Sequence, residues 1–137
     1  MKPHSFLVPA ALGLLAAAAH VAPAAQSRAQ SAAPSRPTGG GDAVRGARLY
    51  QACMGCHALD ENDVGPLHRG VVGRAAAAVP GYAYSAALRR SNILWTPANL
   101  DHWLTSPQAM VPGSKMYFSI PAAQDRRDII AFLGKNP

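Results

Sequence analysis

Two cysteines and a histidine are the residues of this sequence best suited to chemistry. Cys53 and Cys56 are the only cysteines among 137 residues, and His57 follows the second one directly. This C-x-x-C-H spacing is the attachment signature of haem c. At a helix end the two thiols can reach the two vinyl groups on one haem edge, and the next residue then lies under the iron. The motif therefore predicts one covalent haem c on Cys53 and Cys56, with His57 as an iron ligand.

Two other kinds of site use a Cys-x-x-Cys pair. A thioredoxin-like redox site needs a preceding strand and a parallel sheet, and no stretch of this chain alternates apolar and polar residues as a strand does. A zinc site needs a second pair of ligands at metal-binding spacing. The chain has no further cysteine, and its histidines His68 and His102 are not paired. Both alternatives are less favoured than haem attachment.

A second iron ligand is expected from the methionines. Met116 ends a proline-glycine loop between two expected helices, an unusual place for a methionine that only fills the core. Met110 competes with it but follows a helix stop directly, as a hydrophobic contact would. Met54 lies between the two cysteines and cannot reach across. His68 and His102 leave a bis-histidine site open, although each is more typical of a surface or capping histidine. We expect Met116 to be the ligand.

Helices must position these side chains. The apolar pattern predicts an all-α domain, with helices from Asp42 up to the cysteines and over 84–90, 96–106 and 122–134. Thr96 and Pro97 form a helix-start signal, and Pro107 stops that helix. The segments 65–81 and 108–121 are rich in glycine and proline and are expected to be irregular. Such long loops count against a small domain unless they wrap around a cofactor.

The N-terminal part of the chain differs in composition from the rest. Residues 1–24 have a positive start, an apolar stretch and a small-x-small site at Ala22–Ala24, which is typical of a cleaved secretory signal peptide. An uncleaved anchor is the alternative. Residues 25–41 form a flexible leader rich in Ala, Ser, Pro and Gly, and 42–137 the folded domain. We expect an exported, periplasmic protein.

The formal charge of +6 comes from 13 Lys and Arg against 7 Asp and Glu. The basic residues are scattered, without the basic stripe and interleaved aromatics that nucleic-acid binding requires. The simplest interpretation of this charge is a solvated basic surface. A more specific hypothesis is docking to an acidic redox partner. The sequence shows neither a Ser/His/Asp constellation nor paired carboxylates, so no catalytic motif indicates an enzyme.

These motifs together resemble the class I cytochromes c, in particular the cytochrome c2 and mitochondrial cytochrome c branch. The resemblance covers Gly41 to Leu133 and rests on an ordered series of motifs: CMGCH at 53–57, Gly65-Pro66, Gly73-Arg74, Pro80-Gly81-Tyr82-x-Tyr84, Trp95 and PGSKM at 112–116. It implies the cytochrome c fold, in which short helices and loops wrap around one covalently bound haem.

The resemblance also implies roles for individual residues. The Pro66 carbonyl should accept the ring N–H of His57. Haem-propionate contacts are implied for Arg74, Tyr84, Trp95 and Ser114, with plain aromatic packing as the alternative for the tyrosine and the tryptophan. Leu67, Leu100 and Leu104 would pack on the haem, and Gly46 would let the first helix cross the last one beside Phe132.

The sequence departs from this pattern at several points. The segment between His57 and Pro66 is shorter than in the mitochondrial proteins, and Leu88 occupies a site that is often asparagine. Trp103 stands near the position of a tyrosine close to the methionine sulfur. These changes alter the hydrogen bonds around the iron, so the resemblance does not predict the redox potential of this protein.

The expected function is electron transport, as a respiratory-chain carrier whose iron cycles between Fe(III) and Fe(II). The partners would be redox proteins, namely a cytochrome-containing donor complex and an oxidase or other acceptor, and the carrier itself is expected to be a monomer. Two alternatives remain. One is a cytochrome subunit of a larger oxidoreductase, held at the membrane by an uncleaved signal anchor. The other is a haem with an open site that works as a peroxidase or binds a gas.

Overall fold

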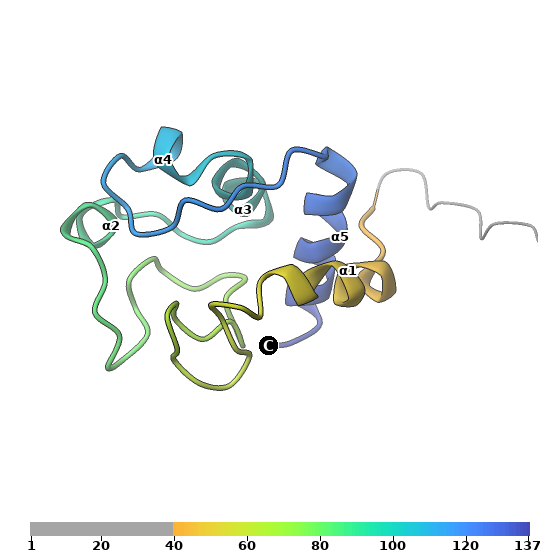
Figure 1. Ribbon diagram of the computed structural model, residues 1–137, viewed down its shortest axis with the longest axis horizontal. Helices are drawn as coiled ribbons and strands as arrows, with labels where there is room; N and C mark the ends of the chain where they lie inside the picture. The colour runs from red at the N-terminus through yellow and green to blue at the C-terminus, as the bar shows by residue number, and fades with distance from the viewer. Residues whose placement is uncertain (1–39) are drawn as a thin grey trace, which may run out of the picture. The chain divides into compact units, whose positions relative to one another are not determined.

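The computed structural model describes residues 40–137, so the expected signal peptide and nearly all of the leader lie outside the described residues. The elements of the described part are α1 (Ala43–Leu49), the 3-10 turn η1 (Tyr50–Ala52), α2 (Ala86–Arg90), α3 (Pro97–Thr105), α4 (Pro107–Met110) and α5 (Ala123–Gly134), as Figure 1 shows. Within 40–137 the only β pairing is an isolated bridge between Ala75 and Leu94. The all-α prediction is confirmed.

Helix α1 ends earlier than expected, and a tighter turn completes the path to the cysteines. The Asp42 carboxylate caps the helix by accepting the backbone N–H groups of Val44 and Arg45 at 2.9 and 3.1 Å. After η1, the Cys53 carbonyl accepts the N–H of Cys56 at 3.1 Å and that of His57 at 2.9 Å. The attachment motif is thus one compact turn at the end of α1 and η1.

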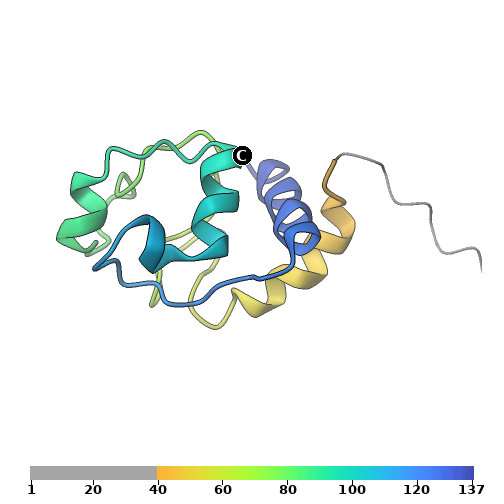
Figure 2. The same ribbon diagram turned by 90° about the horizontal axis from the view of Figure 1, so that it is seen from above.

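The first and last helices cross closely at Gly46. Figures 1 and 2 show α1 and α5 side by side from two directions. A Cβ at Gly46 would overlap the backbone carbonyl of Asp128 and would stand 3.0 Å from the Cβ of Phe132. Only glycine permits this approach, as the resemblance implies.

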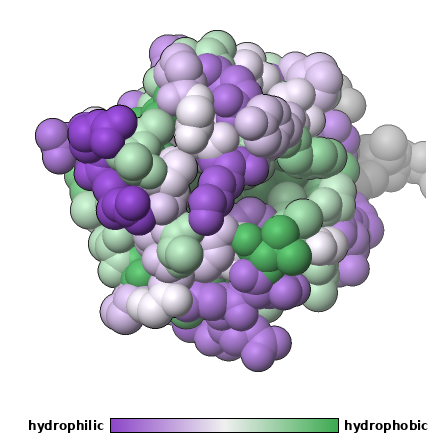
Figure 3. Space-filling view, turned by 60° about the vertical axis from the view of Figure 1, so that its left-hand side comes forward, coloured by the Kyte–Doolittle hydropathy of each residue, from purple (hydrophilic) through white to green (hydrophobic). Residues whose placement is uncertain are grey.

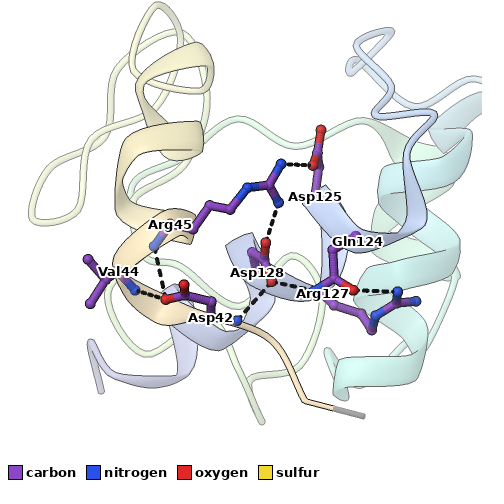
Figure 4. Close-up of polar contacts among 7 residues, drawn as sticks. All are labelled: Asp42, Val44, Arg45, Gln124, Asp125, Arg127 and Asp128. Atoms are coloured by element: carbon purple, nitrogen blue, oxygen red, sulfur yellow. Dashed lines mark hydrogen bonds and ion pairs between the residues drawn. The ribbon is translucent and has the colours of Figure 1, made fainter. Parts of the chain in front are cut away.

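A buried carboxylate also joins the two helices (Figure 4). The Asp128 side chain is 1% exposed, and it accepts the Asp42 backbone N–H at 2.8 Å and the Gln124 amide at 2.7 Å. The Arg45 guanidinium pairs with Asp128 and, at 2.5 Å, with Asp125. The carboxylate therefore meets the requirement that a buried charge be paired and hydrogen-bonded.

The hydrophobic core fills the space between α3, α5 and η1. Thr96 caps α3 by accepting the Asn99 N–H at 3.1 Å, and Pro97 occupies the first turn as predicted. Buried apolar side chains from these elements form one cluster with Val71, Trp95, Val111 and Ile120: Tyr50, Leu100, Trp103, Leu104, Ile129, Ile130 and Leu133. Burial of each large apolar side chain contributes roughly 1.5–3 kcal/mol.

Three further sequence-based expectations need correction. Residues after Pro107 are not all irregular, because α4 begins there with Ser106 as its cap, whose hydroxyl accepts the Ala109 N–H at 3.3 Å. Helix α2 begins at Ala86 and not at Tyr84, since the Ser85 side chain is its N-cap. Arg126 is buried and does not belong to the solvated basic surface.

Arg126 is a structural residue of α5. Its guanidinium donates to the Asp101 carboxylate at 2.8 Å and to the backbone carbonyls of Ile120 and Pro121 at 2.9 and 2.8 Å. These bonds tie the segment before α5 to α3. None of the helices within 40–137 has the length and apolar character needed to cross a bilayer.

Candidate haem-binding site

A cavity of about 410 Å³ lies between the cysteine turn, the loops and α3 and α5. This volume falls in the range of small-molecule and cofactor sites. Its walls are mostly apolar and aromatic and include Tyr50, Val71, Leu88, Leu100, Leu104, Phe118, Ile129 and Leu133. On the face drawn in Figure 3, apolar surface and polar residues alternate around a hollow. Such a lining suits a large planar apolar ligand with a polar edge.

His57 lines this cavity with a fixed tautomer. Its Nδ1 lies 2.8 Å from the Pro66 carbonyl oxygen. A carbonyl can only accept, so Nδ1 carries the hydrogen and Nε2 keeps the lone pair that binds a metal. Burial lowers the pKa of His57, against smaller opposing effects of the Pro66 bond and of Asp63. Burial therefore favours the neutral imidazole, which is the ligating form.

Gly65 fixes the position of the His57 ring from the backbone. A side chain at Gly65 would overlap the imidazole, so the loop can pass this closely only with glycine. The Gly65 N–H donates to the Cys56 carbonyl at 2.6 Å, which ties the loop back to the cysteine turn. The Gly65-Pro66 pair thus holds the ring both by contact and by a hydrogen bond.

His68 is not the surface or capping histidine that its sequence context favoured. Its ring stacks on His57 with centroids 3.9 Å apart, and its Nδ1 lies 3.0 Å from the Tyr50 hydroxyl. Burial, with smaller effects of His57 and Arg74, lowers the pKa of His68 to about 3. No periodic signal marks this half-buried residue, because its contacts depend on a loop that folds over η1. His102, by contrast, is exposed.

Both cysteines line the cavity as free thiols. Cys53 is half-buried, and burial raises its pKa to about 11. A reactive thioredoxin-like cysteine has a lowered pKa and exists largely as thiolate. The environment of Cys53 is the opposite, which argues against thiol exchange.

Met116 also lines the cavity, and a tryptophan holds its sulfur. The Trp103 indole Nε1–H donates to the Met116 Sδ at 3.2 Å. Trp103 is buried on α3, where its ring lies 5.2 Å from that of Trp95. The competing Met110 is the last residue of α4 and packs against the core outside the cavity lining. Met54 is 53% exposed.

The residues expected near the propionates divide into two groups. Arg74, Tyr84 and Trp95 line the cavity. The Arg74 guanidinium donates at 2.8 Å to the carbonyls of both Leu67 and Arg69, and burial lowers its pKa. Ser114 is buried but does not line the cavity, and its hydroxyl accepts the Gln108 amide at 2.8 Å.

Two further expectations can be placed in the same way. Leu100 and Leu104 line the cavity, whereas Leu67 does not and instead offers its carbonyl to Arg74. Gln108 contacts the loop that carries Met116, and nothing in the sequence pattern marked it. Its role depends on a turn whose shape only the folded chain provides.

The residues of the cavity fit a haem c. They supply two thiols, a neutral imidazole with its Nε2 lone pair available, a thioether sulfur and apolar walls. Within 40–137 no group of three or more His, Cys, Asp and Glu side chains could hold a metal ion by itself. A haem iron needs only axial ligands from the protein, because the macrocycle provides the rest.

Comparisons with known proteins identify the family and the fold of this chain. The family model described as Cytochrome c matches residues 43–136. The chain is 46% identical over 100 residues to "Cytochrome c-type cyt cy" of Rhodobacter capsulatus, a match that covers 71% of this chain and half of that protein's length. It is 42% identical over 97 residues to cytochrome c2 of Rhodomicrobium vannielii, covering 68% of this chain and 78% of that one.

A solved structure is similar as well. Cytochrome cH from Methylobacterium extorquens superposes with a TM-score of 0.68 at 41% identity, covering 69% of this chain and 99% of that one. The ordered motifs, the fold and the family match thus agree, and the chain belongs to the cytochrome c family.

Proposed function

We propose that this protein is a one-electron carrier between redox proteins, with one haem c held by Cys53 and Cys56 and ligated by His57 and Met116. One observation carries the proposal. An oriented neutral imidazole and a hydrogen-bonded thioether line the same apolar cavity, beside two free thiols. When bound, the haem iron supplies reversible Fe(III)/Fe(II) chemistry.

The chain's own residues would set the properties of that centre. Each thiol would add its sulfur and hydrogen across one vinyl double bond, so that two thioethers fix the ring to the cysteine turn. The Pro66 carbonyl makes His57 a stronger donor. The Met116 thioether would favour the reduced iron more than a harder donor ligand would. Apolar walls keep water away, and fixed ligands need little rearrangement when the charge changes.

In a carrier, the iron position opposite His57 is closed by a protein ligand. In a haem enzyme, that position is open to a substrate. Trp103 donates to the Met116 sulfur and Gln108 donates to the Met116 backbone carbonyl, which supports a closed position and a non-enzymatic role. The test is to oxidise and reduce the purified protein repeatedly with ferricyanide and ascorbate and then to offer hydrogen peroxide. We expect full reversibility and no peroxidase turnover. Rapid peroxide turnover by the native protein would refute the carrier role.

Localisation is a separate part of the proposal. We infer export to the periplasm with removal of 1–24, on the composition of that segment. The mass of the protein isolated from the producing cell tests this. A mature chain that begins near Ala25 and carries one haem supports a free carrier. A retained Met1 would favour the tethered alternative.

A further inference from the structure

The loop between α4 and α5 carries the proposed ligand Met116, and one side chain of α4 contacts this loop at several points. The Gln108 amide Nε2 lies 2.9 Å from the Ser114 carbonyl, 2.8 Å from the Ser114 hydroxyl and 2.9 Å from the Met116 carbonyl. Its Oε1 accepts the Gly113 N–H at 3.3 Å. One side chain thus bridges three residues of the ligand loop.

Glutamine is chemically suited to this place. A primary amide donates through its nitrogen and accepts through its oxygen within one planar group. Here the nitrogen faces three oxygen acceptors and the oxygen faces a backbone donor. A glutamate would place a charged oxygen against the Ser114 and Met116 carbonyls, which can only accept, and a lysine could not accept from Gly113.

The helix that presents Gln108 is itself fixed. Pro107 is fully buried at the start of α4, and Val111 is buried just after its end. The Val111 N–H donates to the Pro107 carbonyl at 2.8 Å, and the Ser114 N–H donates to the Val111 carbonyl at 3.1 Å. The amide therefore acts from a rigid base on a turn that contains Gly113 with φ of +83°.

The loop has other restraints, but each acts at a single point. The Lys115 ammonium donates to the Ala83 carbonyl at 2.5 Å, and the Ile120 N–H donates to the Leu104 carbonyl at 2.7 Å. The Lys115 contact connects the ligand loop to the segment before α2. The Ile120 contact lies beyond Met116, nearer to α5. Among residues 40–137, only Gln108 joins the turn at Gly113 to the carbonyl of Met116 itself.

We propose that Gln108 is a positioning residue that clamps the Met116 loop and keeps the sulfur on the iron by making loop opening unfavourable. The inference rests on the proposed function, because it takes Met116 as the ligand. An added ligand such as imidazole can reach the ferric iron only after the sulfur leaves. Its apparent affinity is therefore proportional to the fraction of molecules with an open loop.

The test is a spectroscopic imidazole titration of the oxidised holoprotein, with Gln108→Ala and Gln108→Glu beside the unaltered protein. Opening would cost the unaltered protein about one net hydrogen bond more than the alanine variant. We therefore expect imidazole to bind about tenfold more tightly to Gln108→Ala. Gln108→Glu should bind it more tightly still, because the carboxylate repels the Ser114 and Met116 carbonyl oxygens.

Gln124→Ala is the matched control. It also removes a half-buried glutamine, whose amide donates to Asp128, but at the α1–α5 crossing away from the loop. This control should lower resistance to urea and leave imidazole affinity within about twofold. If imidazole binds Gln108→Glu no more tightly than the Gln124→Ala control, the clamp is refuted.

Failure of the clamp and failure of the proposed ligand give different results. If the unaltered oxidised protein lacks the weak sulfur-to-iron absorption band, the Met116 assignment is wrong and the inference falls with it. If that band is present and the Gln108 variants bind imidazole with unchanged affinity, the inference alone is overturned.

Discussion

Replacing Asp128 by asparagine is expected to weaken the crossing of α1 and α5. The substitution keeps the shape of a side chain that is 1% exposed but removes the charge that pairs with Arg45. It also turns one accepting oxygen into a donor among three donors, namely the Asp42 N–H, the Gln124 amide and the Arg45 guanidinium. The side chain cannot satisfy that arrangement without moving.

The magnitude follows from how far each partner is buried. Breaking a fully buried pair costs about 3–5 kcal/mol, because the remaining charge is left without a partner. Arg45 is 37% exposed and keeps Asp125, so water and that carboxylate offset part of the loss. We expect the free energy of unfolding to fall by about 2 kcal/mol. Asp125→Asn, which changes a more exposed partner, should have a much smaller effect.

The pH dependence supplies a second test of the same contact. Burial raises the pKa of Asp128, but the hydrogen bonds from Asp42, Arg45 and Gln124 outweigh it and leave the pKa below the ordinary value. A lowered carboxyl pKa stabilises the fold at pH values above the unfolded pKa of about 3.9, and this stabilisation is lost as the pH falls further. The difference between the native protein and Asp128→Asn should therefore shrink below about pH 4.

Urea unfolding of the holoproteins, followed by far-ultraviolet circular dichroism between pH 3 and pH 7, measures both effects. Two results would refute the account of this crossing. One is a small, pH-independent difference in unfolding free energy between the native protein and Asp128→Asn. The other is an equal loss of unfolding free energy in Asp128→Asn and Asp125→Asn.

Three further substitutions, one of them with a matched control, test the backbone and ligand contacts. Gly46→Ala gains about 1 kcal/mol in helix propensity, but its Cβ would overlap the Asp128 carbonyl on α5. The overlap should dominate and lower the free energy of unfolding, measured with urea, by about 1–3 kcal/mol. Gly134→Ala, with open space around it, should not destabilise it, and equal effects would contradict the crossing. Gly65→Ala should displace the His57 ring and alter the ferric electron paramagnetic resonance spectrum, and an unchanged spectrum would count against the contact. Trp103→Phe removes the N–H donor to the thioether and should shift the sulfur-to-iron band, whereas an unshifted band would show that the contact does not reach the iron.

Local signals predicted most of the helices and led to the residues proposed for the site. Thr96 and Pro97 start α3 because capping and a fixed φ act within one turn, and Asp42 starts α1 for the same reason. The C-x-x-C-H spacing and the proline-glycine loop at Met116 are equally local. The ring N–H contact of His57 with Pro66 is present as the resemblance implied.

Contacts between distant segments were not predictable in this way. His68 is half-buried because its loop folds over Tyr50 and His57, and Gln108 meets the ligand loop because that loop turns back at Gly113. Arg126 is buried because α5 packs on α3. Each of these side chains is polar, and polarity alone favours the surface until a partner from another segment satisfies it.

The most direct measurement of the central claim compares visible spectra of the native protein with those of Met116→Ala and Met110→Ala, oxidised, reduced, and reduced under carbon monoxide. The account predicts a low-spin spectrum with the sulfur-to-iron band and no carbon monoxide binding for the native protein and Met110→Ala. Met116→Ala should lose the band and bind carbon monoxide. A band that survives in Met116→Ala, or ready carbon monoxide binding by the native protein, would contradict the assignment of a closed His57/Met116 electron carrier.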